Sequence, residues 1–223
     1  MPYRVPTPIF HITAIVNLAS VASAGALLSK RLVAERGLTA ADIAYGQIQD
    51  RRAVRQIPIP PGGTLHDYVP FYFAPRSPML MTINSGNVPG CDYRQDDIVH
   101  LVSSAQVIRD SRQLFVFSDF HAVKDFATFY DDLSKLQEID CRVFFEPPLL
   151  DGWSKYFFSR PEPAHHMNRQ ESRMAEFLVH QQVPIGAIAE IGVRTAQGEA
   201  RIRAAIAGTG WNPQINIVPK WYF

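Results

Sequence analysis

The stretch HDYVPFYFAPRSPML, residues 66–80, is the part of the sequence that most strongly predicts the fold. Its VPFYF segment, 69–73, is rich in aromatic and β-branched residues and lies between Asp67 and a proline turn at 75–78. These features predict a buried strand. Because successive strand side chains point to opposite faces, one side belongs to the core and Tyr72 is able to face a ligand. The two prolines fix a rigid bend with an Arg–Ser donor pair at its apex, which is more often a structural turn than a site.

On either side of this stretch, hydrophobic patterning predicts further strands and helices. The expected strands are 97–104, 113–118, 175–180, 188–193 and 215–223. The expected helices are 13–28, with Thr13 as the N-cap and Gly25 near its end, 126–138, and 199–208, with Gly208 as the C-cap. Residues 29–64 are polar, end in PIPPGGT and are predicted to form an irregular loop of the kind that builds active sites. Helices grouped early and strands grouped late favour an α+β layout over alternating βαβ units.

Length and composition predict one folded domain over residues 1–223. Hydrophobic residues make up 47% of the chain and charged residues 19%, which is enough apolar material for a substantial core. The net charge of +1 supplies no overall positive field, so contact with nucleic acid must come from local basic clusters. The cysteines, Cys91 and Cys141, favour a reducing compartment. Because no signal peptide and no stretch of roughly 20 apolar residues is found, we expect a soluble, cytoplasmic protein without a membrane partner.

Several common site motifs are missing from the sequence. It contains no GxGxxG, GxxxxGK[ST], HExxH, CxxC or GxSxG pattern. A dinucleotide would therefore have to be held in a cleft other than a Rossmann site. No two of the seven histidines are separated by the three to five residues of a zinc-binding pair, so no metal is expected.

Three features of the bare sequence are candidate sites with two possible roles each. Glu176 opens an apolar strand, so its carboxylate is either exposed at an edge or directed into a cleft. The cluster of Arg51, Arg52 and Arg55 is usually a solvated face, but it also suits a clamp for phosphates or bases. His11, before a predicted helix, either satisfies a backbone carbonyl, the commoner role, or donates to a ligand.

Six segments together resemble the DarT family of DNA ADP-ribosyltransferase toxins, and they extend over nearly the whole chain. They are IFHITAIVNL (9–18), IQDRR (48–52), HDYVPFYFAPRSPML (66–80), SDFHA (118–122), NRQESRMAEFLVH (168–180) and PKWYF (219–223). The resemblance implies an ADP-ribosyltransferase-like split β-sandwich with flanking helices and an NAD⁺ cleft between its halves. It also implies transfer of ADP-ribose from NAD⁺, used as a substrate, to thymidine in single-stranded DNA.

Alternatives to this function are the same chemistry on guanine, and a catalytically silent module that binds NAD⁺ or nucleic acid. As a toxin of a toxin–antitoxin system, the protein would have a separate macrodomain antitoxin of the DarG type as its partner. The implied enzyme class is glycosyl transfer, with nucleotidyl transfer as a further expectation.

The resemblance also carries residue roles onto this sequence. Glu176 is the expected catalytic glutamate and Arg52 its arginine, with Arg51 exchanged for Arg52 if the alignment slips by one residue. Expected NAD⁺ ligands and residues on the nicotinamide side are His11, Thr13, Asn17, Tyr72, Arg76 and Met79, and expected DNA contacts are Arg55, Asp119 and His121. The carboxylate would stabilise the positive charge that develops at the anomeric carbon. Either Glu176 or the arginine would promote loss of the acceptor proton. A Glu176→Ala change is expected to abolish transfer with little loss of folding.

Overall fold

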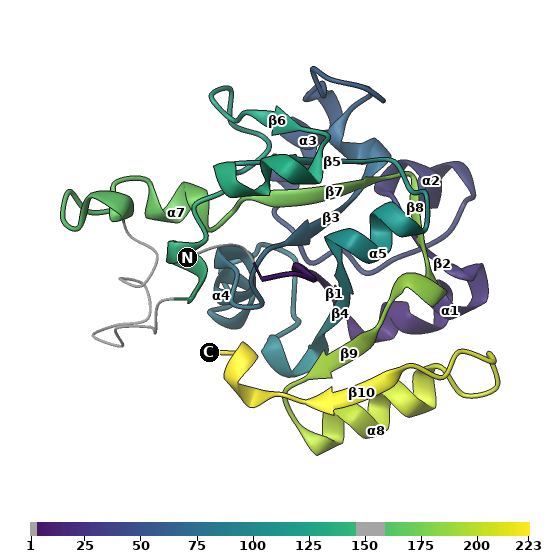
Figure 1. Ribbon diagram of the computed structural model, residues 1–223. Helices are drawn as coiled ribbons and strands as arrows, with labels where there is room; N and C mark the ends of the chain where they lie inside the picture. The colour runs from purple at the N-terminus through teal and green to yellow at the C-terminus, as the bar shows by residue number, and fades with distance from the viewer. Residues whose placement is uncertain (1–3, 146–158) are drawn as a thin grey trace.

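The computed structural model describes residues 4–145 and 159–223 (Figure 1). Its strands are β1 (Pro8–Ala14), β2 (Ala26–Leu28), β3 (Tyr68–Tyr72), β4 (Ile98–Ser104), β5 (Phe115–Ser118), β6 (Phe129–Tyr130), β7 (Glu176–His180), β8 (Gln182–Pro184), β9 (Glu190–Val193) and β10 (Gln214–Ile217). Its helices are α1 (Leu18–Ala24), α2 (Lys30–Glu35), α3 (Gly46–Val54), α4 (Pro78–Asn84), α5 (Ala105–Asp110), α6 (Arg142–Phe145), α7 (Arg169–Ser172) and α8 (Ala196–Ala205). The mixed α+β class expected from the sequence is confirmed.

One large sheet, in the order β10-β9-β4-β1-β3-β7-β5-β6, forms the centre of the fold, and β2 and β8 make a small second sheet. Within the large sheet, neighbouring strands are antiparallel, except for β10 and β9, which are parallel to each other. In Figure 1, β9 and β10 lie at one edge with α8, and β5 and β6 lie toward the other. The sheet is almost divided in the middle, because β1 and β3 share only the Phe10–Tyr72 register pair. The expected split β structure therefore takes the form of two half-sheets joined at one point.

Aromatic side chains hold the half-sheet of β3, β7 and β5 together. The rings of Phe117 and Phe177 are nearly parallel, with centroids 6.1 Å apart, and Phe115 stacks on Phe177 at 5.0 Å. Phe71, in the register position opposite Phe177, is fully buried. Burying each such ring contributes on the order of 2 kcal/mol. This rigid half of the sheet carries Glu176 at the first position of β7.

The first predicted helix is wrong over its first part. Residues 13 and 14 belong to β1, which pairs with β4 from Pro8–Ser104 to Ala14–Ile98, so Thr13 is not an N-cap. The helix α1 starts only at Leu18 and ends before Gly25, whose φ is 68°, so the last predicted residues, 26–28, form strand β2 instead. Pairing with a fully buried neighbouring strand decided the conformation of an apolar run whose spacing fitted either structure.

Other boundaries also differ from the sequence-based expectations. Residues 126–138 form β6 and a 3₁₀ turn at Leu133–Glu138, because the Asp132 side chain accepts the Ser134 N–H and starts a tight turn. The segment 29–64 contains α2 and α3 as well as loop, and the last predicted strand ends at Ile217. The helix α8 ends before Gly208, whose φ is 74°. Strands occur along the whole chain, so helices are not grouped before strands as expected. The α+β class is correct, but this argument for it was wrong.

Within the described parts of the chain, no helix combines the length and the apolar character needed to cross a membrane.

Candidate active site

A cavity of about 460 Å³ lies where β1 and β3 separate, and its volume is in the range of small-molecule sites. β1 contributes His11 and Thr13, β3 contributes Tyr72, β7 contributes Glu176 and α3 contributes Arg52. Because β1 and β3 touch at one register pair only, the gap between the half-sheets becomes the site. The loop 38–44, between α2 and α3, forms a further wall.

Glu176 and Arg52 form a buried ion pair at the floor of this cavity. Arg52 Nη1 donates to both carboxylate oxygens, at 3.0 Å to Oε1 and 2.8 Å to Oε2. Glu176 is 2% exposed and Arg52 is 8% exposed, and Arg52 is the buried residue of helix α3. The main-chain N–H of Ala122 donates to Oε1 at 3.2 Å. Arg52 Nη2 is buried and has no hydrogen-bond partner among the described residues, so it can donate to a substrate.

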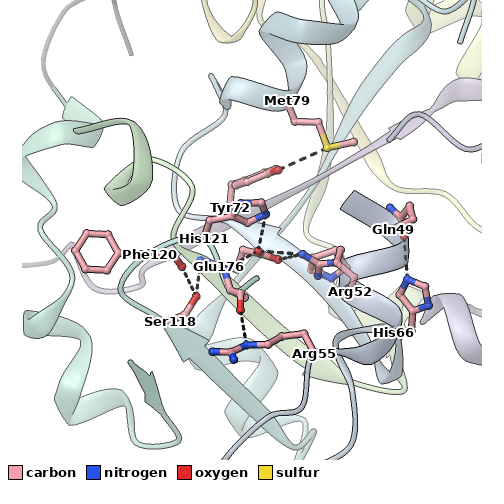
Figure 2. Close-up of polar contacts among 12 residues, drawn as sticks. Gln49, Arg52, Arg55, His66, Tyr72, Met79, Ser118, Phe120, His121 and Glu176 are labelled. Atoms are coloured by element: carbon pink, nitrogen blue, oxygen red, sulfur yellow. Dashed lines mark hydrogen bonds and ion pairs between the residues drawn. The ribbon is translucent and has the colours of Figure 1, made fainter. Parts of the chain in front are cut away.

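His121 and Tyr72 line the cavity together with this pair, and Figure 2 shows the His121 ring directed at Glu176. His121 Nε2 lies 3.7 Å from Glu176 Oε1, and burial lowers the pKa of its imidazole despite the nearby carboxylate. Burial, reinforced by the charge of Glu176, raises the pKa of the Tyr72 phenol, which donates to Met79 Sδ at 3.6 Å. Both side chains are therefore neutral around pH 7.

The strand β1 presents two polar side chains with defined hydrogen-bonding roles. His11 Nδ1 lies 2.7 Å from the Pro70 carbonyl, and since a carbonyl only accepts, Nδ1 carries the proton and Nε2 is an acceptor. Burial lowers the pKa of His11 to about 4, although the Pro70 bond opposes this shift. The hydroxyl of Thr13 accepts from Asn17 Nδ2 at 3.0 Å, which leaves its own proton available to donate. The site thus offers one acceptor and one donor side by side.

Asn17, which also lines the cavity, holds the loop 38–44 through its side-chain amide. Its Oδ1 accepts from Ala41 N at 2.7 Å, and its Nδ2 donates to Ala41 O at 3.0 Å. Lys30 forms an ion pair of 2.6 Å with Asp42 in the same loop. The loop is therefore held at Ala41 by Asn17, which precedes α1, and at Asp42 by Lys30 of α2.

A second cavity of about 300 Å³ adjoins the first. Its lining residues include Arg51, Thr82, Lys124 and Met174. The residues that line both cavities are Ile43, Ala44, Ile48, Tyr72, Met79 and His121. Two compartments therefore meet beside the Glu176–Arg52 pair, which is the arrangement needed to bring two substrates together.

Most of the site residues expected from the sequence line the first cavity. Four of the expected residues do not line it. Arg51 Nη2 donates to Val123 O at 3.4 Å and lines only the second cavity. Arg55 donates to main-chain carbonyls of the 122–124 segment and to Asp125, so its guanidinium holds the 122–125 loop in place. Arg76 lines neither cavity, and its guanidinium lies 5.7 Å above the Phe223 ring. Asp119 accepts from Thr128 N at 2.8 Å and lines neither cavity.

Other lining residues had been missed by the sequence reasoning. In the first cavity these include Lys30, the loop 38–44 and the His66–Gln49 pair, whose Nε2 and Oε1 atoms are 3.0 Å apart. In the second they include Lys124 and Thr82. The polar composition of 29–64 indicated the region but not these residues, because a polar side chain on a cavity wall has the same sequence signature as one in solvent. Among residues 4–145 and 159–223, no cluster of three metal-ligating side chains is found.

The half-sheets, the cleft between them and the buried carboxylate–guanidinium pair define the class of enzyme that transfers ADP-ribose. Comparison with known proteins agrees. Residues 10–223 match the family model described as ssDNA thymidine ADP-ribosyltransferase, DarT, and the chain belongs to this DarT family. A protein of Thermus sp. (strain 2.9) named DNA ADP-ribosyl transferase is 37% identical over 225 residues, covering 99% of this chain and 98% of its own.

Solved structures give the same result. Thermus sp. 2.9 DarT in complex with ADP-ribosylated single-stranded DNA matches with a TM-score of 0.84 and 35% identity over 100% of this chain and 99% of its own. The same protein in complex with NAD⁺ matches with a TM-score of 0.81 and 32% identity over 100% of each chain. Thermosipho africanus DarTG in complex with ADP-ribose, at 19% identity, has the same fold, with a TM-score of 0.75 over 97% of this chain and 51% of its own. The expected enzyme class is confirmed, and NAD⁺ as its substrate agrees with these complexes. The expected nucleotidyltransferase class finds no support.

Proposed function

We propose that this protein transfers ADP-ribose from NAD⁺ to thymidine in single-stranded DNA. The observation that carries the proposal is the buried Glu176–Arg52 pair, which lines the larger cavity beside residues, among them His121, that this cavity shares with the smaller one. The family description, and relatives solved with NAD⁺ and with ADP-ribosylated DNA, support it.

NAD⁺ occupies the larger cavity in this proposal. Its ribose and amide groups meet the acceptor nitrogen of His11, the donor hydroxyl of Thr13 and the unbonded Nη2 of Arg52. Apolar side chains from α1, β2 and α2, among them Val21, Leu27 and Val33, line the same cavity and suit the planar rings of a dinucleotide. A cleft of this kind needs no Rossmann glycine motif.

The chemistry follows from the buried carboxylate. Breaking the bond between nicotinamide and ribose leaves the anomeric carbon electron-poor, and a fixed negative charge nearby stabilises that state. Glu176 is held for this role by Arg52 Nη1 and by the Ala122 N–H. Because all these partners are already in place, little reorganisation is needed when the charge develops.

The acceptor base occupies the smaller cavity. Tyr72 and Met79, shared by both cavities, offer flat and apolar surfaces to a base, while Arg51 and Lys124 supply positive charge for the strand. A base that is modified on its pairing edge cannot remain in a duplex, so the substrate is single-stranded.

The biological role that we propose is that of a toxin acting in the cytoplasm. Modified DNA bases block copying of the strand, so a cell making this enzyme needs a second protein that reverses the modification. A macrodomain chain of the DarG type fits, because such a module binds ADP-ribose. The T. africanus structure named DarTG, in complex with ADP-ribose, motivates this partner.

The test is incubation of the protein with NAD⁺ and short single strands that differ only in one central base. Mass spectrometry should find an ADP-ribose increment on the strand containing thymidine. An increment on guanine alone would reassign the acceptor. If no strand gains mass and no nicotinamide is released, the protein is a silent binding module and the proposal is wrong.

A further inference from the structure

The residues shared by the two cavities include one side chain that can accept a proton. Of these residues, Ile43, Ala44 and Ile48 are apolar, Met79 is a thioether, and the Tyr72 phenol donates to that sulfur. His121 alone carries a basic nitrogen. It therefore lies where the reacting parts of two substrates would meet.

The His121 ring has no hydrogen bond to any described residue. It is 8% exposed, and its nearest charged neighbour is Glu176, with Nε2 and Oε1 3.7 Å apart. Burying a polar ring without a partner is costly, so such groups usually meet a ligand or water. The ring lines both cavities, so a ligand in either one can supply the missing bond.

The other two candidates for accepting a proton are poorly suited. Arg52 is a guanidinium, which has five donors and no acceptor. Glu176 Oε1 already accepts from Arg52 Nη1 and from Ala122 N, and Oε2 accepts from the same Nη1. A proton arriving on this carboxylate would weaken the bonds that hold it against the anomeric carbon.

We infer, on the basis of the proposed function, that His121 is the catalytic base that removes the proton from the acceptor nitrogen of the DNA base. As the glycosidic bond of NAD⁺ breaks, nicotinamide leaves with the bonding electron pair. The acceptor nitrogen forms the new bond to the anomeric carbon with the electron pair of its N–H bond. The proton of that bond passes to the imidazole and then to solvent. The products are the ADP-ribosylated base, nicotinamide and one proton.

The surroundings of His121 suit this role. Burial lowers the pKa of the ring, and the positive charges of Arg52, Lys124 and Arg51 act in the same direction, so the imidazole is neutral and able to accept. Glu176 opposes this shift, and it faces the imidazolium once the proton has been taken. Proton uptake is therefore followed by a favourable charge pair.

The loop that carries His121 is fixed to α3 by two arginines. Arg55 donates to Ala122 O at 3.4 Å and to Lys124 O at 3.0 Å, and Arg51 donates to Val123 O at 3.4 Å. The same loop supplies the Ala122 N–H to Glu176. The base and the catalytic carboxylate therefore keep their relative positions through one rigid segment.

The experiment compares wild type, His121→Ala and His121→Gln in single-turnover transfer to a thymidine-containing strand with saturating NAD⁺. Both variants should transfer at least about 100-fold more slowly, the usual contribution of a catalytic base, while the dissociation constants for NAD⁺ and the strand change by less than about threefold. Added imidazole should restore part of the rate of His121→Ala in proportion to its neutral form. His121→Gln, whose side chain fills the space, should not respond.

A matched control is His180→Gln. His180 lies on the same strand as Glu176, packs its ring against Tyr68 at 5.1 Å and lines neither cavity, so its rate should equal that of wild type. Transfer by either His121 variant within about threefold of wild type would overturn the inference. So would a loss of transfer that follows loss of DNA binding and that imidazole does not repair. A wild-type protein that modifies no strand would instead overturn the proposed function, and this inference with it.

Discussion

The side-chain amide of Asn17 pairs with the main chain of Ala41 as one strand pairs with another, accepting from its N–H at 2.7 Å and donating to its carbonyl at 3.0 Å. Ala41 lies in the loop 38–44, which forms one wall of the larger cavity. The sequence had marked Asn17 as a direct NAD⁺ ligand. Because its amide is already bonded to Thr13 and Ala41, we propose that Asn17 acts as a positioning residue of this cavity.

Replacing Asn17 by Ala should therefore raise the KM for NAD⁺ about tenfold and leave kcat within about twofold. Two lost hydrogen bonds contribute on the order of 1–2 kcal/mol to the ordered loop, and 1.4 kcal/mol is a factor of ten in binding. The measurement is nicotinamide release at varied NAD⁺, with Ser23→Ala, on an exposed face of α1, as the control. An unchanged KM would show that the loop does not depend on this clamp.

Glu176→Gln should lower kcat by about 10³-fold or more and should also destabilise the fold, contrary to the expectation that loss of Glu176 affects folding little. The variant leaves the buried Arg52 without its carboxylate, and an uncompensated buried charge costs roughly 3–5 kcal/mol. Urea unfolding measures this cost. The double variant Glu176→Gln/Arg52→Met should regain much of the stability and none of the activity.

The surface pair Arg203–Glu199 provides the control for this experiment. Arg203 and Glu199 lie one helical turn apart on the surface of α8. Glu199→Gln should therefore change the free energy of unfolding by less than about 1 kcal/mol. Equal destabilisation by Glu176→Gln and Glu199→Gln would contradict the buried-pair argument.

Acid should weaken the fold between pH 6.5 and 4. Burial lowers the pKa of both His11 and His100 from 6.5 to about 4. As the pH falls below 6.5, the unfolded chain takes up protons at these positions while the folded chain does not, so the free energy of unfolding decreases. At pH 5 the loss is about 2 kcal/mol for each histidine. Urea unfolding at pH 7.5 and pH 5 measures it, and His100→Gln should show a smaller difference. Equal stability at the two pH values would contradict these shifts.

Gly192→Ala should destabilise the protein by about 2 kcal/mol. A Cβ at this position of β9 would overlap ring carbons of Trp221, and overpacking of this kind usually costs 1–3 kcal/mol. The control is Gly186→Ala, where the added methyl meets no atom within 4 Å. Thermal unfolding of the two variants provides the comparison. If the melting temperature of Gly192→Ala equals that of wild type, the Trp221 ring moves aside with no loss of stability and the prediction is wrong.

Local patterning predicted most strands within a few residues, because aromatic and β-branched runs such as 69–73 favour extended backbone wherever they lie. The same reasoning failed for 13–14 and 126–138. In the first case an apolar run was taken into β1 by pairing with β4. In the second, Asp132, whose side chain accepts the Ser134 N–H and starts a tight turn, interrupted a helical spacing. Both outcomes depend on partners or side-chain bonds that a periodicity count does not contain.

The sequence by itself determined the α+β class, the positions of most strands and the family, through the identities of residues such as Glu176 and His11. Only the tertiary structure decided which of these residues meet. Arg52 and Glu176 are 124 positions apart and touch because α3 and β7 both border the larger cavity. Arg76 and Asp119, equally plausible in the sequence, lie outside both cavities. The physical reason is that side-chain type and spacing set local conformation, whereas distances across a cleft are set by the order of strands in the sheet and by what each helix buries.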